Sequence, residues 1–115
     1  MGSKSAIYKN AALTGTAILV KTGPCSLNSY HIFNTTTAEC YVQFFDAAAA
    51  ADVTVGTSPT FVLGIPAETS AGLGAGAYCV IPKSIQFTLG LVVASTTAAD
   101  GSTGAIVAVL LGIGD

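Results

Sequence analysis

The sequence predicts an all-β protein, an antiparallel β-sandwich of seven or eight strands. Apolar and weakly polar residues alternate with period two over residues 84–94, which is typical of a strand with one core-facing side. Turn-forming residues recur at short intervals, for example at 22–24, 34–37, 58–59 and 100–102. Only the alanine run at 47–51 favours a helix, and it is too short to form one alone.

The 115 residues suffice for a single domain. Residues 1–12 lack a strong pattern and are expected to form an extended N-terminal arm, which leaves 13–115 as the β-sandwich domain. Segments 16–20 and 105–111 are apolar on both faces, which suits strands inside a sandwich or beneath a partner. The glycine-rich segment 70–77 is expected to be a flexible loop. The predicted strands cover residues 14–21, 25–34, 39–46, 52–56, 60–65, 77–81, 85–95 and 104–112.

Charged residues are scarce in this chain. They make up 9% of the sequence, whereas about 25% is usual for a soluble domain, and the net charge is −2. Such a surface offers little repulsion between copies, so we expect other protein to cover much of it. The apolar stretches 84–99 and 101–114 carry no formal charge, and each is shorter than the ~20 residues of a membrane-spanning helix. The four lysines are scattered and form no patch for nucleic acid.

His31 and Cys40 provide the one outline of a catalytic pair. A tight hairpin at 34–37 would place them opposite each other, as in a nucleophilic dyad. The register is not determined by the sequence, and no orienting residue or oxyanion donor accompanies the pair. The glycines at 72–76 precede a short strand rather than the helix that a phosphate-binding turn requires. We therefore expect a structural histidine, no cofactor and no enzymatic activity.

The cysteines and acidic residues give no metal site. Cys25, Cys40 and Cys79 include no closely spaced pair, and we expect buried thiols, with an intermolecular disulfide as the alternative outside a reducing compartment. Asp46 and Asp52 flank the alanine run, but two carboxylates rarely complete a calcium site. Capping of turns through backbone N–H groups is the expected role of these two residues.

Two segments resemble a known class of protein. YVQFFDAAAAADVTVGTSPTFVLGIPA at 41–67 and SIQFTLGLVVASTTAADGSTGAIVAVLL at 84–111 are similar to small phage-encoded virion structural proteins, of the capsid decoration, cement or head-fibre type. The likeness covers residues 27–111. It implies a jelly-roll-like β-sandwich on a bacteriophage capsid surface or fibre, made in the host cytoplasm, and it carries over no catalytic residue.

Together these features predict a noncatalytic virion protein that decorates or cements the phage capsid through symmetric contacts. The expected partners are further copies of the chain, as a homotrimer, and the major capsid protein or another virion protein. Alanines allow close approach and tyrosines suit interfaces, which gives six candidate assembly contacts. These are Ile7, Tyr8, Ala48, Ala49, Ala50 and Tyr78. The alternative is a receptor- or glycan-binding module of a head or tail fibre, with loops 70–78 or 96–104 as its contact region.

Overall fold

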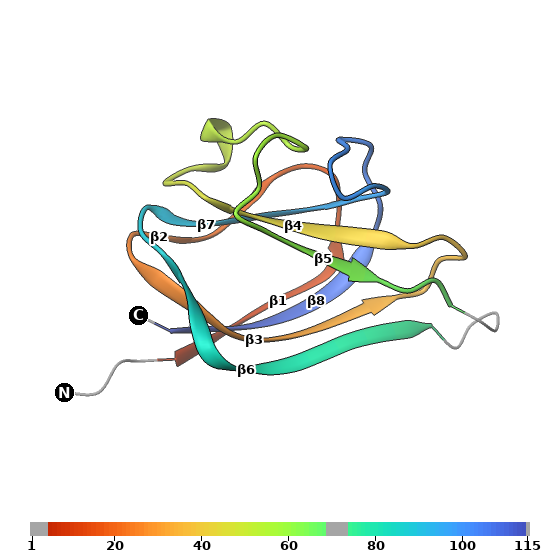
Figure 1. The fold of residues 1–115 in the computed structure, drawn as a ribbon, viewed down its shortest axis with the longest axis horizontal. Helices are drawn as coiled ribbons and strands as arrows, with labels where there is room; N and C mark the ends of the chain where they lie inside the picture. Colours follow the sequence, from red (N-terminus) through yellow and green to blue (C-terminus); the bar gives the residue numbers. More distant parts are fainter. Residues whose placement is uncertain (1–4, 69–73, 115) are drawn as a thin grey trace.

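The computed structural model describes residues 5–68 and 74–114 and shows two antiparallel four-stranded sheets packed face to face (Figure 1). The first sheet has the strand order β1-β8-β3-β6, and the second has the order β2-β7-β4-β5. These orders are those of an eight-stranded jelly roll, and the predicted antiparallel β-sandwich is confirmed. The strands are β1 (Ser5–Leu13), β2 (Ile18–Thr22), β3 (Cys25–Asn34), β4 (Cys40–Asp46), β5 (Phe61–Ile65), β6 (Ala75–Phe87), β7 (Gly90–Thr96) and β8 (Val107–Gly114).

The core lies between the two sheets, where alternate side chains of each strand meet. Phe44 of the second sheet and Phe87 of the first are among its largest fully buried members. In β8, Val107, Val109 and Leu111 point into this core. Burial of each large apolar side chain contributes about 1.5–3 kcal/mol. Period-two apolar spacing therefore determines which side of each strand faces inward.

Residues 5–13 form an edge strand rather than an arm, which corrects the expectation for residues 1–12. Strand β1 pairs antiparallel with β8, from Ser5 opposite Gly114 to Asn10 opposite Val109. Tyr8 packs against the core and Leu13 is fully buried. Residues 1–4 lie outside the described part of the chain. An edge strand buries few side chains, so its alternation is weak in the sequence.

The strand predicted at 85–95 is divided by a turn, which is a second correction. Strand β6 ends at Phe87 in the first sheet, and β7 begins at Gly90 in the second. Gly90 has a φ of 154°, and a Cβ there would lie 2.6 Å from the carbonyl oxygen of Ala47. Leu89 belongs to the alternating apolar pattern of 84–94, which predicts that it faces the core, but it lies in the turn and is exposed. The chain thus crosses between sheets where the sequence continues an unbroken apolar pattern.

The separation predicted between strands 77–81 and 85–95, at Pro82, is also absent. Strand β6 runs from Ala75 to Phe87 through this proline. Because β6 is the edge of the first sheet, a residue without an N–H donor is tolerated there. The predicted flexible loop at 70–77 overlaps the start of β6, and its residues 70–73 lie outside the described residues.

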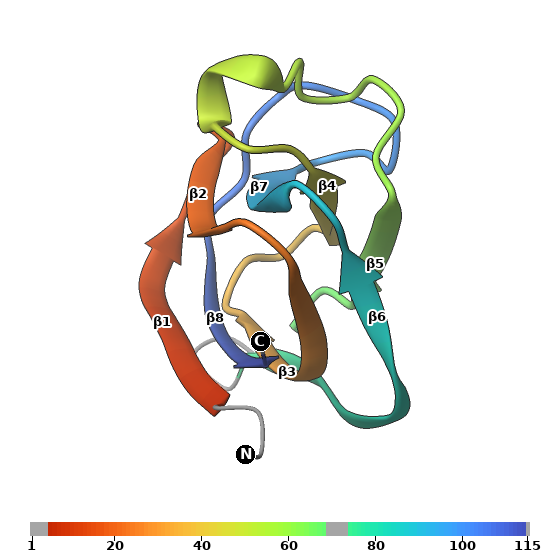
Figure 2. The same ribbon diagram turned by 90° about the vertical axis from the view of Figure 1, so that its left-hand side faces the viewer.

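The prediction of a strand at 52–56 is wrong. The chain forms a short 3-10 helix, η1 (Ala50–Asp52), followed by a turn in which Gly56 has a φ of 90°. In Figures 1 and 2, the loop after β4 and the loop between β7 and β8 both lie on the outer side of the second sheet. The central strands of the second sheet, β7 and β4, are therefore covered on both faces by the protein's own chain.

Candidate functional site

The alanine run covers an apolar patch on the outer side of the second sheet. Phe45 of β4 and Val92 of β7 are paired neighbours and are buried outside the main core. Ala47 completes this small cluster, and Ala50 and Val53 pack against it. Short side chains let the loop lie close to the sheet. The alanines thus serve the protein's own fold at this point.

The side chain of Gln43 forms hydrogen bonds with both loops that cover the second sheet. Its side chain is fully buried, and its Oε1 accepts a hydrogen bond of 2.8 Å from the Gly56 N–H. Its Nε2 donates to the carbonyl of Gly101 at 2.9 Å and to Thr96 Oγ1 at 3.0 Å. One amide therefore links β4 to the loop after it and to the loop that precedes β8. This role of Gln43 could not be predicted from the sequence, because a glutamine on a strand carries no signal of it.

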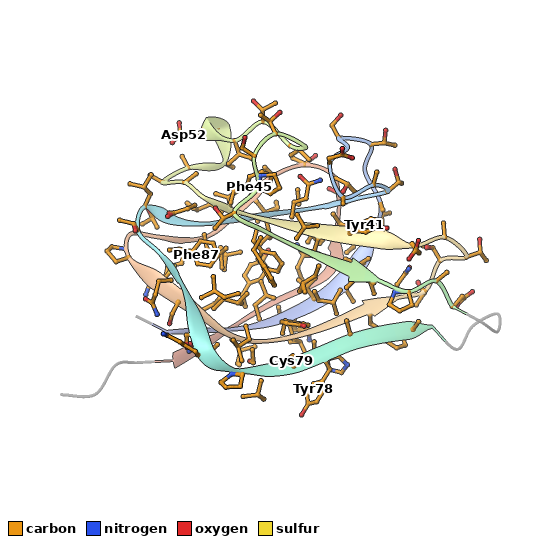
Figure 3. The ribbon with its side chains drawn as sticks, in the orientation of Figure 1. Tyr41, Phe45, Asp52, Tyr78, Cys79 and Phe87 are labelled. Carbon is orange, nitrogen blue, oxygen red and sulfur yellow. The ribbon has the colours of Figure 1, made fainter. Side chains whose placement is uncertain are left out.

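The outer side of the first sheet has no comparable cover among the described residues. In Figure 3, Tyr78 points away from the sandwich on this side, whereas Cys79 points inward. The exposed fraction is 73% for Tyr78, 70% for Ile7 and 42% for Leu110. We call this surface the bare face. It consists of Ile7, Lys9, Ser29, His31, Phe33, Gly76, Tyr78, Val80, Ala108, Leu110 and Gly112.

The strand register arranges the bare face in rows that run across the sheet. The first row is Ile7, Gly112, Ser29 and Val80, from β1 to β6. The second row is Lys9, Leu110, His31 and Tyr78, in the same direction. The third row is Ala108, Phe33 and Gly76, from β8 to β6.

Two shallow apolar hollows result from this arrangement. The larger, about 330 Å³, lies over the small residues Gly112 and Ser29 and is flanked by Ile7 and Val80. The second, about 260 Å³, lies beside Phe33. Lys9 is the one formally charged side chain of the bare face. A nearly uncharged face of this kind is suited to contact with another protein.

His31 is a surface residue of this face and has no relation to Cys40. Its ring contacts Tyr78 edge to face, with the ring centroids 5.7 Å apart. Cys40 is buried in the core on β4, which belongs to the other sheet. The hypothetical His31–Cys40 pair is therefore not formed, because β3 and β4 do not pair with each other.

No disulfide joins any two of the three cysteines, all of which lie in the described part of the chain. Cys25 and Cys40 are buried as expected, and Cys79 is half-buried, pointing inward opposite Tyr30. Burial raises the pKa of Tyr30 above its ordinary value, and the neighbouring Cys79 thiol adds to this increase. The tyrosine therefore stays uncharged, as its place against the core requires.

The role predicted for Asp46 is confirmed. Its carboxylate accepts hydrogen bonds from the N–H groups of Thr88, Leu89 and Gly90 in the turn between β6 and β7, the shortest at 2.7 Å from Leu89. Burial acts to raise the pKa of Asp46, but these hydrogen bonds outweigh it and lower the pKa below its ordinary value. Asp52 is exposed on η1 and makes no such cap. Across residues 5–68 and 74–114, no three histidine, cysteine or acidic residues are grouped as metal ligands.

The candidate assembly residues fall into separate regions. Ile7 and Tyr78 lie on the bare face and are the most exposed apolar residues there. Tyr8, the neighbour of Ile7 on β1, points toward the core, and its hydroxyl accepts a hydrogen bond from Asn10 Nδ2. Ala48, Ala49 and Ala50 lie at the opposite side of the molecule, above the second sheet.

Sequence reasoning missed Leu110 and Val80 as surface residues. Segment 105–111 is apolar on both faces, and such a pattern does not distinguish a core-facing from a partner-facing side. Val80 lies two positions after Tyr78 in the predicted strand 77–81, which carries apolar or aromatic residues on both faces, so here too the pattern does not identify the outer side.

The fold and the bare face together define a small all-β sandwich, in which loops cover the outer side of one sheet and no described residue covers that of the other. Comparison with family models, with curated proteins and with solved structures finds no match to this chain. In the described residues, no helix is both long and apolar enough to cross a membrane.

Proposed function

We propose that this chain is a noncatalytic structural protein whose copies associate through the bare face, and that the resulting oligomer decorates or cements a phage capsid. The observation that carries the proposal is the difference between the two sheets. The second sheet is covered by its own loops, whereas no described segment covers the apolar outer side of the first. A monomer would leave Ile7, Tyr78 and Val80 more than half exposed to water.

The energetics of the bare face favour burial. Apolar surface removed from water contributes about 25 cal/mol per Å². The face carries one formal charge, Lys9 at its β1 edge, so association requires little charge desolvation. A typical specific contact buries about 800 Å² per partner, roughly an eighth of the 6044 Å² surface of one copy. The sparse charge elsewhere is consistent with further contacts to a larger shell.

A substitution in the centre of the bare face tests the self-association. Leu110→Asp places a carboxylate in that centre and should convert the oligomer to a monomer in sedimentation experiments. Leu19→Asp is the matched control, because Leu19 is 39% exposed, against 42% for Leu110, and lies on the second sheet. The control should keep the native mass. Equal native masses for wild type and Leu110→Asp would refute this role of the bare face.

The finer part of the proposal is a homotrimer on a capsid, in contact with the major capsid protein or another virion protein. It is supported by the resemblance of segments 41–67 and 84–111 to virion proteins. The jelly-roll topology, which recurs in viral capsids, is compatible with it. Co-sedimentation of the purified protein with capsids that lack it is the test. Binding that saturates at a symmetric number of copies would support it, and absence of binding would contradict it.

Glycan binding is the second candidate, and one observation favours it. A polar hollow of about 240 Å³ beside η1 is lined by the side chains of Asp52, Thr54, Thr57 and Thr60, among others. A hollow lined by several hydroxyl and carboxylate groups is suited to forming hydrogen bonds with a sugar. Titration with a glycan panel, followed by NMR, distinguishes the candidates. Shifts confined to residues 52–60 would favour the fibre-module function, and we expect none.

A further inference from the structure

The two lateral edges of the bare face differ in chemistry. At the β1 edge, the first two rows end in Ile7 and Lys9, and at the β6 edge they end in Val80 and Tyr78. Ile7, Val80 and Tyr78 are the most exposed large apolar or aromatic residues of this face, at 70%, 66% and 73%. The positions between Ile7 and Val80 are the small residues Gly112 and Ser29. The face is therefore bordered by two raised edges with a hollow between them.

We infer that the β6 edge of one copy docks against the β1 edge of the next copy, in a closed ring whose axis runs along the strands of the first sheet. This inference rests on the proposed function, since it specifies how copies meet through the bare face. Rotation about such an axis does not shift residues along the strands. Each row of one copy therefore meets the same row of its neighbour, for a ring of any size.

In this ring, the side chains that meet between equivalent rows of neighbouring copies are chemically compatible. Val80 of one copy lies beside Ile7 of the next, above the hollow over Gly112, so that apolar side chains pack on each other. Tyr78 of one copy lies beside Lys9 of the next, where the ammonium group and its aliphatic stem can pack on the ring.

Charge favours this arrangement over a contact of two β1 edges. If two β1 edges met around a two-fold axis that crosses the strands at the second row, Lys9 of each copy would lie opposite the other, which is unfavourable. Contact of unlike edges avoids this repulsion. Such a contact is heterologous, and it produces a closed ring when the rotation closes.

Paired charge substitutions test the contact directly. Within one chain, Ile7 and Val80 are separated by strands β8 and β3, which corresponds to about 14 Å at the usual strand spacing. Their side chains therefore cannot pair within a copy. Ile7→Glu or Val80→Lys alone should raise the dissociation constant roughly tenfold or more, because each places one charge in an apolar contact.

The double variant Ile7→Glu with Val80→Lys should restore the wild-type native mass, since the new charges face each other between copies. The restored association should weaken as salt is added. The matched control, Ile7→Glu with Leu19→Lys, has the same net charge but places the lysine on the second sheet, and should remain dissociated. Thermal unfolding of every variant verifies that it is folded.

The outcomes separate this inference from the proposed function. If wild type assembles and Leu110→Asp dissociates it, but the double variant stays as dissociated as the single variants, the edge pairing is overturned and the bare-face assembly stands. If Ile7→Glu with Leu19→Lys assembles as well as the double variant, the edge pairing is also overturned. If wild type is itself monomeric, both proposals are overturned.

Discussion

Replacing Gln43 with alanine should release the two loops that cover the second sheet. The substitution removes the acceptor of the Gly56 N–H and the donor to the Gly101 carbonyl. Each hydrogen bond contributes about 1 kcal/mol net, and each buried group left without a partner costs about 1–3 kcal/mol. Gly56 and Gly101 are only half-buried, so the lower part of this range applies to them. We expect a loss of about 2–4 kcal/mol in the free energy of unfolding.

Thermal unfolding followed by circular dichroism measures this loss. At about 4 °C per kcal/mol for a chain of this size, the melting temperature should fall by about 8–16 °C. Release of the loops should also expose Phe45 and Val92, and thus increase the binding of an apolar dye. Gln86→Ala is the matched control, because Gln86 is an exposed glutamine on β6, and it should melt within about 2 °C of wild type.

The near-isosteric variant Gln43→Glu gives the reasoning a sharper test. A carboxylate keeps the acceptor for the Gly56 N–H but directs an oxygen at the carbonyls of Ala99 and Gly101, where Nε2 now donates. Burial and these carbonyls raise the folded-state pKa of the introduced glutamate above its unfolded value of about 4.3. The variant is therefore less stable than wild type at pH 7, and the difference shrinks as the pH falls and the acid becomes protonated. A Gln43→Glu variant as stable as wild type at pH 7 would refute the account of this link.

Two further substitutions test the turn between the sheets and the core. Because hydrogen bonds lower the pKa of Asp46, its stabilising contribution is present above about pH 4 and is lost as the pH falls through its folded-state value. In thermal melts, wild type should therefore exceed Asp46→Asn in stability by about 1 kcal/mol at pH 7, and this gap should shrink as the pH falls below about 4. A gap that does not change with pH would contradict this role. Ser95 Oγ is fully buried and is the one such side-chain oxygen or nitrogen without a hydrogen-bond partner in residues 5–68 and 74–114. Ser95→Ala should be neutral or stabilising by up to about 1 kcal/mol in chemical denaturation, and a clear loss of stability would show that the hydroxyl has a partner.

Strands with clear local boundaries could be predicted from the sequence. The prediction of 25–34 coincides with β3, which begins directly after Pro24 and ends at Asn34. The buried side chain of Asn34 donates to the carbonyls of Ala38 and Pro66 and so closes the following turn. In this region, local turn chemistry and the tertiary structure favour the same boundaries.

Boundaries that depend on distant contacts could not be predicted. The division at Thr88 and Leu89 depends on Asp46, which is more than forty positions away in the chain. The tolerance of Pro82 depends on β6 being an edge strand, a property of the sheet order rather than of nearby residues. The alanine run was expected to lie close against another surface, and this surface is the outer side of the protein's own second sheet.

The bare face was only partly predictable. Ile7 and Tyr78 were among the candidate contacts, Ile7 within the expected N-terminal arm and Tyr78 because tyrosines suit interfaces. Their neighbours Leu110 and Val80 became visible only when the register placed β1, β8, β3 and β6 side by side. The row arrangement is a property of strand pairing, which a single sequence does not specify.

The native mass of the wild-type protein over a wide concentration range, measured by sedimentation equilibrium, tests the central claim most directly. One copy has a mass of 11.4 kDa. We predict a stable oligomer, with a trimer at three times that mass, down to micromolar concentrations. A mass of 11.4 kDa at every concentration, with the bare face in contact with water, would contradict the account.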